Sequence, residues 1–285
     1  MIYFTKMEGI GNDYIYINGF KENIPNPKEL AISMSEQHFG CGADGLILIL
    51  PSEIADFKMR MFNKDGSESE MCGNGMRCVA RYCYDKNLTD KTEFSVESGG
   101  AIKYISLKTK FTNTNTKPEV VSITVDMGTP KLLFSEIPVI STKTQDLTHE
   151  LSVGNETYIT TLVNMGNPHA VLFIQDNVQC APVLTLGPML ECHTDFPQKA
   201  NIEFAQILDS SNINMRVWER GSGETLACGT GACAVCVAGV LRGLCNREVN
   251  ITLPGGTLQI HWNKENNHVY LTGPANYVYE GTWLK

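Results

Sequence analysis

The stretch Met71-Cys72-Gly73-Asn74-Gly75 recurs later in the chain as Ala227-Cys228-Gly229-Thr230-Gly231. Both copies contain Cys-Gly-x-Gly, and the second cysteine lies 156 positions after the first. Each copy is followed by an apolar segment that predicts a helix. Two cysteines in matching turns at matching helix starts indicate one site built from two similar halves.

The helices behind these turns define the expected architecture. Residues 232–241 are apolar on every side, and a helix of this kind is buried all round in a soluble protein. A second helix is expected over 76–84, and a surface helix over 27–38. Segments rich in β-branched residues, bounded by Gly, Pro and Asn, predict strands on both sides of the buried helices. They are 2–5, 14–18, 46–50, 57–62, 93–96, 102–107, 120–126, 250–253 and 257–262. We therefore expect an α+β fold, in which a mixed, barrel-like sheet wraps a central buried helix in each half.

The same offset relates further parts of the chain. Residues 60–64 fall on 216–220, and at an offset of 155 Gly11-Asn12 falls on Gly166-Asn167. Matches in one order at a nearly fixed offset predict a duplicated domain. The expected halves are 1–130 and 150–275, joined by a linker at 131–150, and the C-terminal strand 276–285 is expected to return to the first half. Residues 108–118 are expected to form a surface loop.

Composition excludes several classes of protein. Among 285 residues, 42% are hydrophobic and 19% charged, as in globular proteins, and no run of eighteen apolar residues exists to span a membrane. The N-terminus does not resemble a signal peptide. A net charge of −8 disfavours a nucleic-acid partner. Ten cysteines without a secretion signal indicate a reducing compartment, so we expect a cytoplasmic protein whose cysteines pack, bind metal or catalyse.

The paired turns favour catalysis. A helix N-terminus stabilises a thiolate, and its backbone N–H groups bind anions. Two such starts would hold one carboxylate and place a thiol and a thiolate beside the adjacent carbon. One cysteine could then remove a proton from a stereocentre while the other returns a proton to the opposite face. We see no cofactor motif, so we expect no cofactor.

A zinc site is the competing interpretation. Cys233 and Cys236 form a CxxC pair, but they lie inside the apolar helical segment, which offers no polar surroundings. We therefore predict no metal site and treat the cysteines outside the two turns as packing residues. A zinc-binding protein without enzymatic activity remains the alternative, and it would contain stoichiometric zinc.

Further motifs extend along almost the whole chain, and together they resemble the diaminopimelate epimerase family. In the first half they are Phe4-Thr5-Lys6-Met7, Gly11-Asn12-Asp13, Phe62-Asn63-x-Asp65-Gly66-Ser67 and Met71-Cys72-Gly73-Asn74-Gly75-x-Arg77-Cys78. In the second half they are Gly166-Asn167-Pro168-His169, Asn201-Ile202-Glu203-Phe204, Glu219-Arg220-Gly221-x-Gly223-Glu224-Thr225 and Ala227-Cys228-Gly229-Thr230-Gly231. The resemblance implies cofactor-independent interconversion of LL- and meso-diaminopimelate, in lysine and peptidoglycan synthesis. It also implies the two-domain fold expected above.

The resemblance assigns roles to positions of this chain. Cys72 and Cys228 are the expected acid/base pair, and Glu219 and His169 are expected near the reacting amine and the thiols. The backbones of Gly73-Asn74 and Gly229-Thr230 are expected to bind the carboxylate at the reacting carbon. The remaining substrate contacts, mostly to the distal amino-acid end, are expected from Asn12, Asn63, Asn167, Asn201 and Arg220.

The chain departs from the family pattern twice. Glu8 stands where many members have His, and Gly45 follows Asp44 where some members have a substrate-binding Gln. A same-fold racemase for another amino acid, such as histidine, is the alternative within enzymes, although Arg220 and the asparagines favour a substrate with a second amino-acid end. The expected partner is a small molecule, and a homodimer is the assembly considered.

Overall fold

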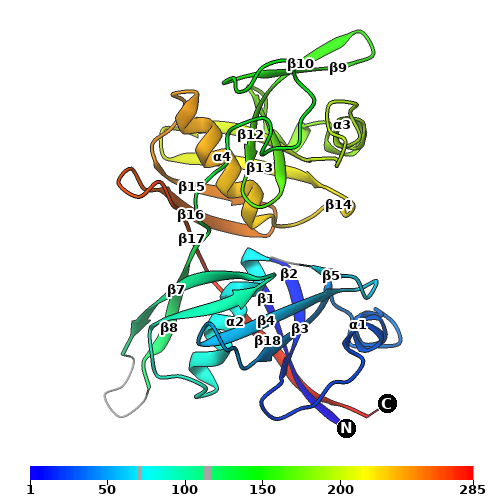
Figure 1. The fold of residues 1–285 in the computed structure, drawn as a ribbon, viewed down its shortest axis with the longest axis vertical. Coiled ribbons are helices and arrows are strands. Elements are labelled where there is room, and N and C mark those ends of the chain that lie inside the picture. The colour runs from blue at the N-terminus through cyan, green and yellow to red at the C-terminus, as the bar shows by residue number, and fades with distance from the viewer. Residues whose placement is uncertain (70–71, 112–116, 285) are drawn as a thin grey trace. The chain divides into compact units, whose positions relative to one another are not determined.

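The two helices expected behind the paired turns are present in the computed structural model, which describes residues 1–69, 72–111 and 117–284 (Figure 1). They are α2 (Gly73–Asp85) and α4 (Gly229–Leu241). Both begin directly after the cysteine, three residues earlier than expected, because Cys72 and Cys228 act as N-caps. Each sulfur accepts a hydrogen bond from the backbone N–H three residues on.

The chain divides into two compact units. Unit 1 contains Met1–Asp126 and Thr272–Lys285, and unit 2 contains Met127–Leu271. Residues 131–150, expected as a linker, belong instead to unit 2, where Phe134 and Ile137 are part of a hydrophobic core. No helix in the described ranges is long and apolar enough to cross a membrane.

Unit 1 is a set of strands around α2, with α1 (Pro27–Ser35) packed against β3 and β4. Its strands are β1 (Ile2–Gly9), β2 (Asn12–Asn18), β3 (Gly45–Leu50), β4 (Phe57–Asn63), β5 (Glu68–Ser69), β6 (Glu93–Ser98), β7 (Ala101–Lys110), β8 (Glu119–Asp126) and β18 (Asn276–Trp283). The chain ends lie side by side because β18 pairs antiparallel with β1, with Ile2 opposite Trp283 (Figure 1).

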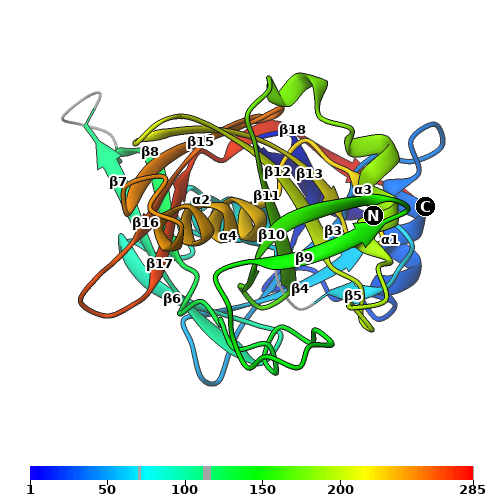
Figure 2. The same ribbon diagram turned by 90° about the horizontal axis from the view of Figure 1, so that it is seen from above.

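Unit 2 repeats this plan around α4. Its strands are β9 (His149–Val153), β10 (Glu156–Asn164), β11 (Pro168–Ile174), β12 (Asn201–Asp209), β13 (Asn212–Glu219), β14 (Gly223–Glu224), β15 (Glu248–Leu253) and β16 (Gly256–Trp262), and β17 (Val269–Gly273) runs across the boundary between the units. The hairpin of β9 and β10 is clear in Figure 2. The short helix α3 (Val183–Glu191) and the 3-10 turn η1 (Val178–Cys180) precede β12.

The two units share strand order and register. In each unit an antiparallel pair is followed by a parallel pair and then another antiparallel pair: β1, β2, β3, β4 in unit 1 and β10, β11, β12, β13 in unit 2. Leu46 lies opposite Phe62, and Ile202 lies opposite Trp218; both members of the second pair follow the first by 156 positions. The repeat seen in the sequence is therefore also a repeat of strand pairing.

Helix α4 is buried because its side chains are apolar on every side, as the sequence suggests. Between Gly229 and Gly239, only Thr230 of α4 is not buried, and the helix contacts β10, β11, β12, β15 and β16. Small residues also let neighbouring segments approach the helix closely: a methyl group at Gly239 would lie 2.6 Å from Cys245 Sγ, in the turn that follows α4. Helix α2 contacts β1, β2, β7 and β8 in the same way. These arrangements confirm the expected α+β class with a buried helix in each strand-rich half.

Several local predictions were wrong. Helix α1 ends at Ser35 rather than at 38, and β7 extends to Lys110 into the expected loop 108–118, of which 112–116 lie outside the described residues, as does Met71 of the first turn. The sequence analysis also missed α3, the strands β9, β10, β12, β13 and β17, and the short strands β5 and β14. The two-residue strands β5 and β14 carry too few residues to show a periodic pattern.

Candidate active site

The first cysteine cluster (Asn12, Cys72, Gly73 and Asn74) lies at the N-terminus of α2 in unit 1. The Cys72 thiol lies 3.3 Å from Asn12 Oδ1, and its sulfur accepts from the Gly75 N–H at 3.3 Å. Asn74 Nδ2 also lies within reach of Asn12 Oδ1, at 3.4 Å. The structure therefore brings three of the predicted residues of unit 1, Asn12, Cys72 and Asn74, into mutual contact.

Two charged residues support this cluster from opposite sides. Arg77, fully buried in the first turns of α2, donates to Asn74 Oδ1 at 3.0 Å and to the Pro274 carbonyl at 2.9 Å. Asp44 accepts from Asn12 Nδ2 at 2.7 Å. These bonds hold the Asn12 and Asn74 amides, so the polar groups around the Cys72 sulfur have defined orientations.

Asn63 is the remaining predicted residue of unit 1. It ends β4, where its side chain donates to Ser67 Oγ at 3.0 Å. Gly45 lies opposite Asn63 on one side and opposite Tyr14 of β2 on the other. Asn63 is thus at the same end of the sheet as the start of β2.

The second cysteine cluster (His169, Asn167, Glu203, Glu219, Cys228 and Thr230) lies at the N-terminus of α4 in unit 2. The Cys228 sulfur accepts from the Gly231 N–H at 3.4 Å and lies 3.6 Å from the Thr230 hydroxyl. Only 4% of Cys228 is exposed. Burial raises the pKa of the Cys228 thiol well above its ordinary value, and the nearby carboxylates of Glu219 and Glu203 raise it further.

Glu219 faces the same sulfur from β13. Desolvation raises the pKa of its carboxyl, and the Glu203 charge adds to the rise, while hydrogen bonds with Thr225 and Cys228 lower it. The Thr225 hydroxyl donates to Glu219 Oε1. The structure therefore places Glu219 beside the Cys228 sulfur.

His169 connects two strands of unit 2. Its Nδ1 lies 2.6 Å from Glu203 Oε1, and its Nε2 lies 2.8 Å from Asn167 Oδ1. Both the His169 and the Glu203 side chains are completely buried. The parallel register of β11 and β12, with His169 opposite Asn201, produces this contact between residues 34 positions apart.

Asn201 and Arg220 form the neighbouring group. Asn201 Oδ1 accepts from the Arg220 backbone N–H at 2.9 Å, and Asn201 Nδ2 donates to the Pro168 carbonyl at 2.9 Å. The exposed Arg220 guanidinium donates to the Gln198 carbonyl at 3.2 Å. Asn201 thus ties the turn that carries Arg220 to the first residue of β11.

Both turns combine the N-terminal N–H groups of a helix with a closely packed second glycine. The first N–H groups of a helix have no partner within it and attract negative charge. A methyl group at Gly75 would lie 2.7 Å from Ile47 Cδ1, and one at Gly231 would lie 2.8 Å from Glu203 Oε1. The second glycine of each turn therefore lies closely against a side chain of the neighbouring strand, Ile47 of β3 or Glu203 of β12.

The sequence analysis missed four supporting residues. Asp44 and Arg77 hold amides of the first cysteine cluster, Glu203 holds His169, and Glu191 accepts from the Gly221 N–H at 3.0 Å, beside Arg220. Two signals were available: Arg77 and Glu203 lie within the motifs quoted above, and Glu203 is a charged residue in an otherwise apolar segment. Cys233 and Cys236 are buried in α4, and no metal-binding group of three His, Cys, Asp or Glu occurs in the described ranges.

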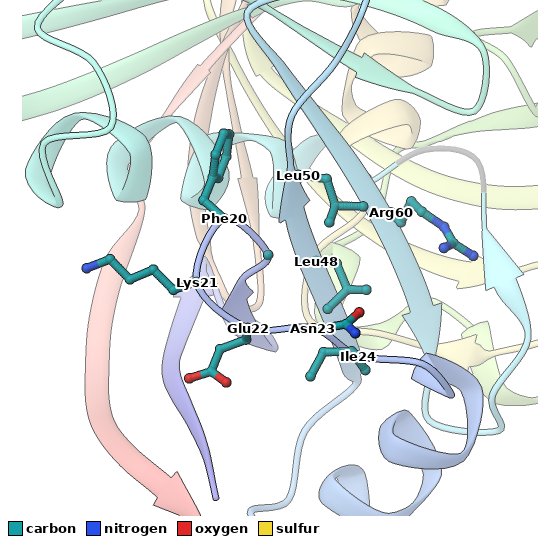
Figure 3. Close-up of a pocket in the computed structure, with 9 residues that line it drawn as sticks. Phe20, Lys21, Glu22, Asn23, Ile24, Leu48, Leu50 and Arg60 are labelled. Carbon is teal, nitrogen blue, oxygen red and sulfur yellow. The ribbon is translucent and has the colours of Figure 1, made fainter.

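A separate cavity lies elsewhere in unit 1. Its volume is about 260 Å³, and its lining comes from residues 19–24, Leu48, Leu50 and Arg60 (Figure 3). Arg60 is already paired with Glu68, at 2.7 Å. None of the predicted site residues lines this cavity, so it does not compete with the cysteine clusters as the active site.

Solved structures with this fold define its class. The chain superposes on a probable proline racemase from Agrobacterium radiobacter with a TM-score of 0.72 at 12% identity, covering 99% of this chain and 93% of the other. A phenazine biosynthesis protein of the PhzF family from Bacillus anthracis gives a TM-score of 0.71 at 17% identity, covering 100% and 99%. The fold is therefore that of the proline racemase-like and PhzF-like proteins.

Sequence comparison is more specific. A profile described as "Diaminopimelate epimerase" matches residues 4–133 and 161–278. A diaminopimelate epimerase from Methanococcus maripaludis is 51% identical over 278 residues, which cover 98% of each chain, and one from Acetivibrio thermocellus is 51% identical over 98% of this chain and 97% of the other. The chain belongs to the diaminopimelate epimerase family and is an isomerase.

Proposed function

We propose that this protein interconverts LL- and meso-diaminopimelate by proton transfer at the α-carbon, with Cys72 and Cys228 as the two acid/base groups. The observation that carries the proposal is the matched pair of cysteine N-caps, in a chain half identical to proteins named diaminopimelate epimerase. The shared name supports the substrate, and the paired thiols support the mechanism.

The proton balance is simple. One cysteine, as thiolate, takes the α-proton and becomes a thiol; the other, as thiol, gives its proton to the opposite face of the carbon and becomes a thiolate. No net proton or electron is exchanged, so this chemistry requires no cofactor. The reverse reaction exchanges the roles of the cysteines.

The energetic difficulty lies in the carbanion. An amino-acid Cα–H is less acidic than a thiol by on the order of 20 pK units, or roughly 27 kcal/mol. Helix N-termini can lower this barrier, because their N–H groups stabilise the negative charge that develops on the substrate carboxylate. We assign this role to the backbones of Gly73-Asn74 and Gly229-Thr230, at the first turns of α2 and α4.

The remaining polar residues would hold the substrate. Arg220 can bind the distal carboxylate through its guanidinium fork, and the turn that carries it is braced by Asn201 and Glu191. Asn amides donate and accept, as an amino-acid end requires. Glu219 and His169 would act near the amine and the thiols. The substrate-binding asparagines are Asn12, Asn63, Asn167 and Asn201.

This activity would serve lysine and peptidoglycan synthesis in the cytoplasm. The two units, Met1–Asp126 with Thr272–Lys285 and Met127–Leu271, would each supply one cysteine to the reaction. A homodimer is the assembly that we propose to test by size-exclusion chromatography with light scattering. We assign no nucleic-acid or membrane partner to this reaction.

The deciding experiment is hydrogen–deuterium exchange at Cα in deuterated buffer. LL- and meso-diaminopimelate should both exchange and interconvert, whereas L-proline, L-histidine and other L-amino acids should exchange far more slowly. Exchange of another amino acid at a higher kcat/KM than diaminopimelate would replace the substrate assignment. Purified protein that exchanges none of these substrates would overturn the reaction class.

A further inference from the structure

Glu203 occupies a position that is apolar in the other half of the molecule. Its counterpart 156 positions earlier is Ile47, and both side chains lie against the second glycine of a Cys-Gly-x-Gly turn. The residues of β12 from Asn201 to Ala205 are all buried. A carboxylate has thus replaced a hydrocarbon side chain in the layer directly below the start of α4.

This carboxylate is poorly compensated. Glu203 Oε1 is bound by His169 Nδ1, but Oε2 has no hydrogen-bond partner in the described part of the chain. Burying a half-satisfied carboxylate is unfavourable, and an apolar residue of similar size would generally be as stable or more stable. Stability alone therefore does not account for Glu203.

The bond from Glu203 fixes the ring of His169. His169 Nδ1 and Glu203 Oε1 lie 2.6 Å apart and share a hydrogen bond. Because this bond holds the imidazole ring, Glu203 determines the direction in which Nε2 points. Nε2 in turn lies 2.8 Å from the Asn167 amide. The three residues form a chain from the buried strand β12 to an amide predicted to bind substrate.

The surroundings keep this chain in place. Two carboxyl groups lie near the His169 ring: Glu203, on β12, and Glu219, on β13. Glu203 Oε1 also packs against Gly231 in the first turn of α4. A methyl group at Gly231 would lie 2.8 Å from Glu203 Oε1 and 3.2 Å from Cys228 Sγ. Glu203 therefore has little room to turn away from His169.

We propose that Glu203 is a positioning residue that acts through His169 to orient the Asn167 amide for substrate binding. Glu203 itself does not touch the substrate. The proposal rests on the proposed function, since the effect on turnover is measured with diaminopimelate, but the orientation of Asn167 can be measured without any reaction.

Two variants test the proposal by kinetics. Glu203→Ile reproduces the residue found in the other half and should fold, because it removes a buried charge. It should raise KM for diaminopimelate by on the order of tenfold, about the effect of one lost hydrogen bond, with a smaller change in kcat. Glu203→Gln keeps an acceptor for Nδ1 and should recover part of the loss. Glu224→Gln, in a partly buried pair with Arg216, is the matched control and should leave KM unchanged.

A double-mutant cycle tests the route through His169. If Glu203 acts only through the ring, Glu203→Ile should add nothing to the KM of a His169→Gln variant. Additive effects of the two substitutions would overturn the proposal.

A measurement without turnover separates this proposal from the proposed function. The side-chain amide resonances of Asn167, assigned with an Asn167→Asp variant, should shift or broaden in Glu203→Ile and stay in place in Glu224→Gln. Unchanged Asn167 resonances would overturn the positioning role, even in an active enzyme. Shifted resonances in a protein that fails to epimerise diaminopimelate would support the positioning and reject the substrate.

Discussion

The Asn12 side chain donates to the Asp44 carboxylate across 2.7 Å, and the amide oxygen of Asn12 faces the Cys72 thiol at 3.3 Å. Asp44 also accepts from the Asp13 backbone N–H at 3.2 Å. The bond from Asn12 Nδ2 to Asp44 holds the amide nitrogen, so the amide oxygen is the end that points to the Cys72 sulfur. Asp44 is therefore a support for Cys72, in a chain that has Gly45 where some family members have a substrate-binding Gln.

Replacing Asp44 should disturb substrate binding. Asp44→Ala leaves the Asn12 amide free to rotate, and we expect KM for diaminopimelate to rise on the order of tenfold. Asp44→Asn retains an acceptor and should have a smaller effect. Steady-state epimerisation measures both, with Asp56→Ala, which removes surface bonds to Ser95 and Lys91, as the control. An unchanged KM for Asp44→Ala would show that Asn12 does not depend on Asp44.

Either active-site cysteine should be indispensable. Cys72→Ala and Cys228→Ala each remove one of the two proton-transfer groups, and we expect a loss of about 10²- to 10⁴-fold in kcat for epimerisation. Circular dichroism should show that both variants are folded. Cys180→Ala, at an exposed cysteine outside both clusters, should keep full activity. The two-base scheme fails if either variant retains the wild-type rate.

Arg220 should determine preference for a second carboxylate. Arg220→Ala should lower kcat/KM for diaminopimelate by roughly 10- to 100-fold, the range for a charged hydrogen bond. Arg220→Lys should be intermediate, because lysine keeps the charge and loses the fork. Slow Cα exchange of L-alanine, which lacks a distal carboxylate, should be affected much less. Equal losses on both substrates would remove this role from Arg220.

Glu219 should make stability depend on pH. Its pKa is raised above the ordinary value of 4.5, mainly by desolvation. The stability it contributes is therefore complete below about pH 4.5 and is lost as the pH rises through its folded pKa. Glu219→Gln cannot ionise and therefore does not lose this stability. The difference in free energy of unfolding, variant minus wild type, should increase as the pH rises above about 4.5 and then level off above the folded pKa of Glu219.

Urea unfolding across about pH 4 to 7.5 measures this difference. Glu265→Gln, at an exposed position, controls for the change in net charge. A difference between Glu219→Gln and wild type that stays constant over this range would contradict the raised pKa. Activity of Glu219→Gln should nevertheless fall, because stability gained at an active site is often accompanied by a loss of function.

The sequence by itself determined the parts of this protein that depend on composition and repetition. A segment such as 232–241 has no polar side, so it can only be a buried helix, and the repeated Cys-Gly-x-Gly turns marked both helix starts. The segments rich in β-branched residues predicted the α+β class, and the motifs along the chain indicated the family through their resemblance. The apolar pattern placed the helix starts three residues late, because glycine has a low helix propensity and the capping by the cysteine sulfur has no signature in the sequence.

Only the tertiary structure decided how the supporting charges are placed. His169 meets Glu203 because β11 and β12 pair in parallel, and such a pair needs a long crossover whose register depends on packing rather than on local sequence. Asp44 reaches Asn12 at the start of β2 for the same reason, through the parallel pair of β2 and β3. A sequence shows which residues can carry a charge, whereas strand register decides which amide or imidazole that charge holds.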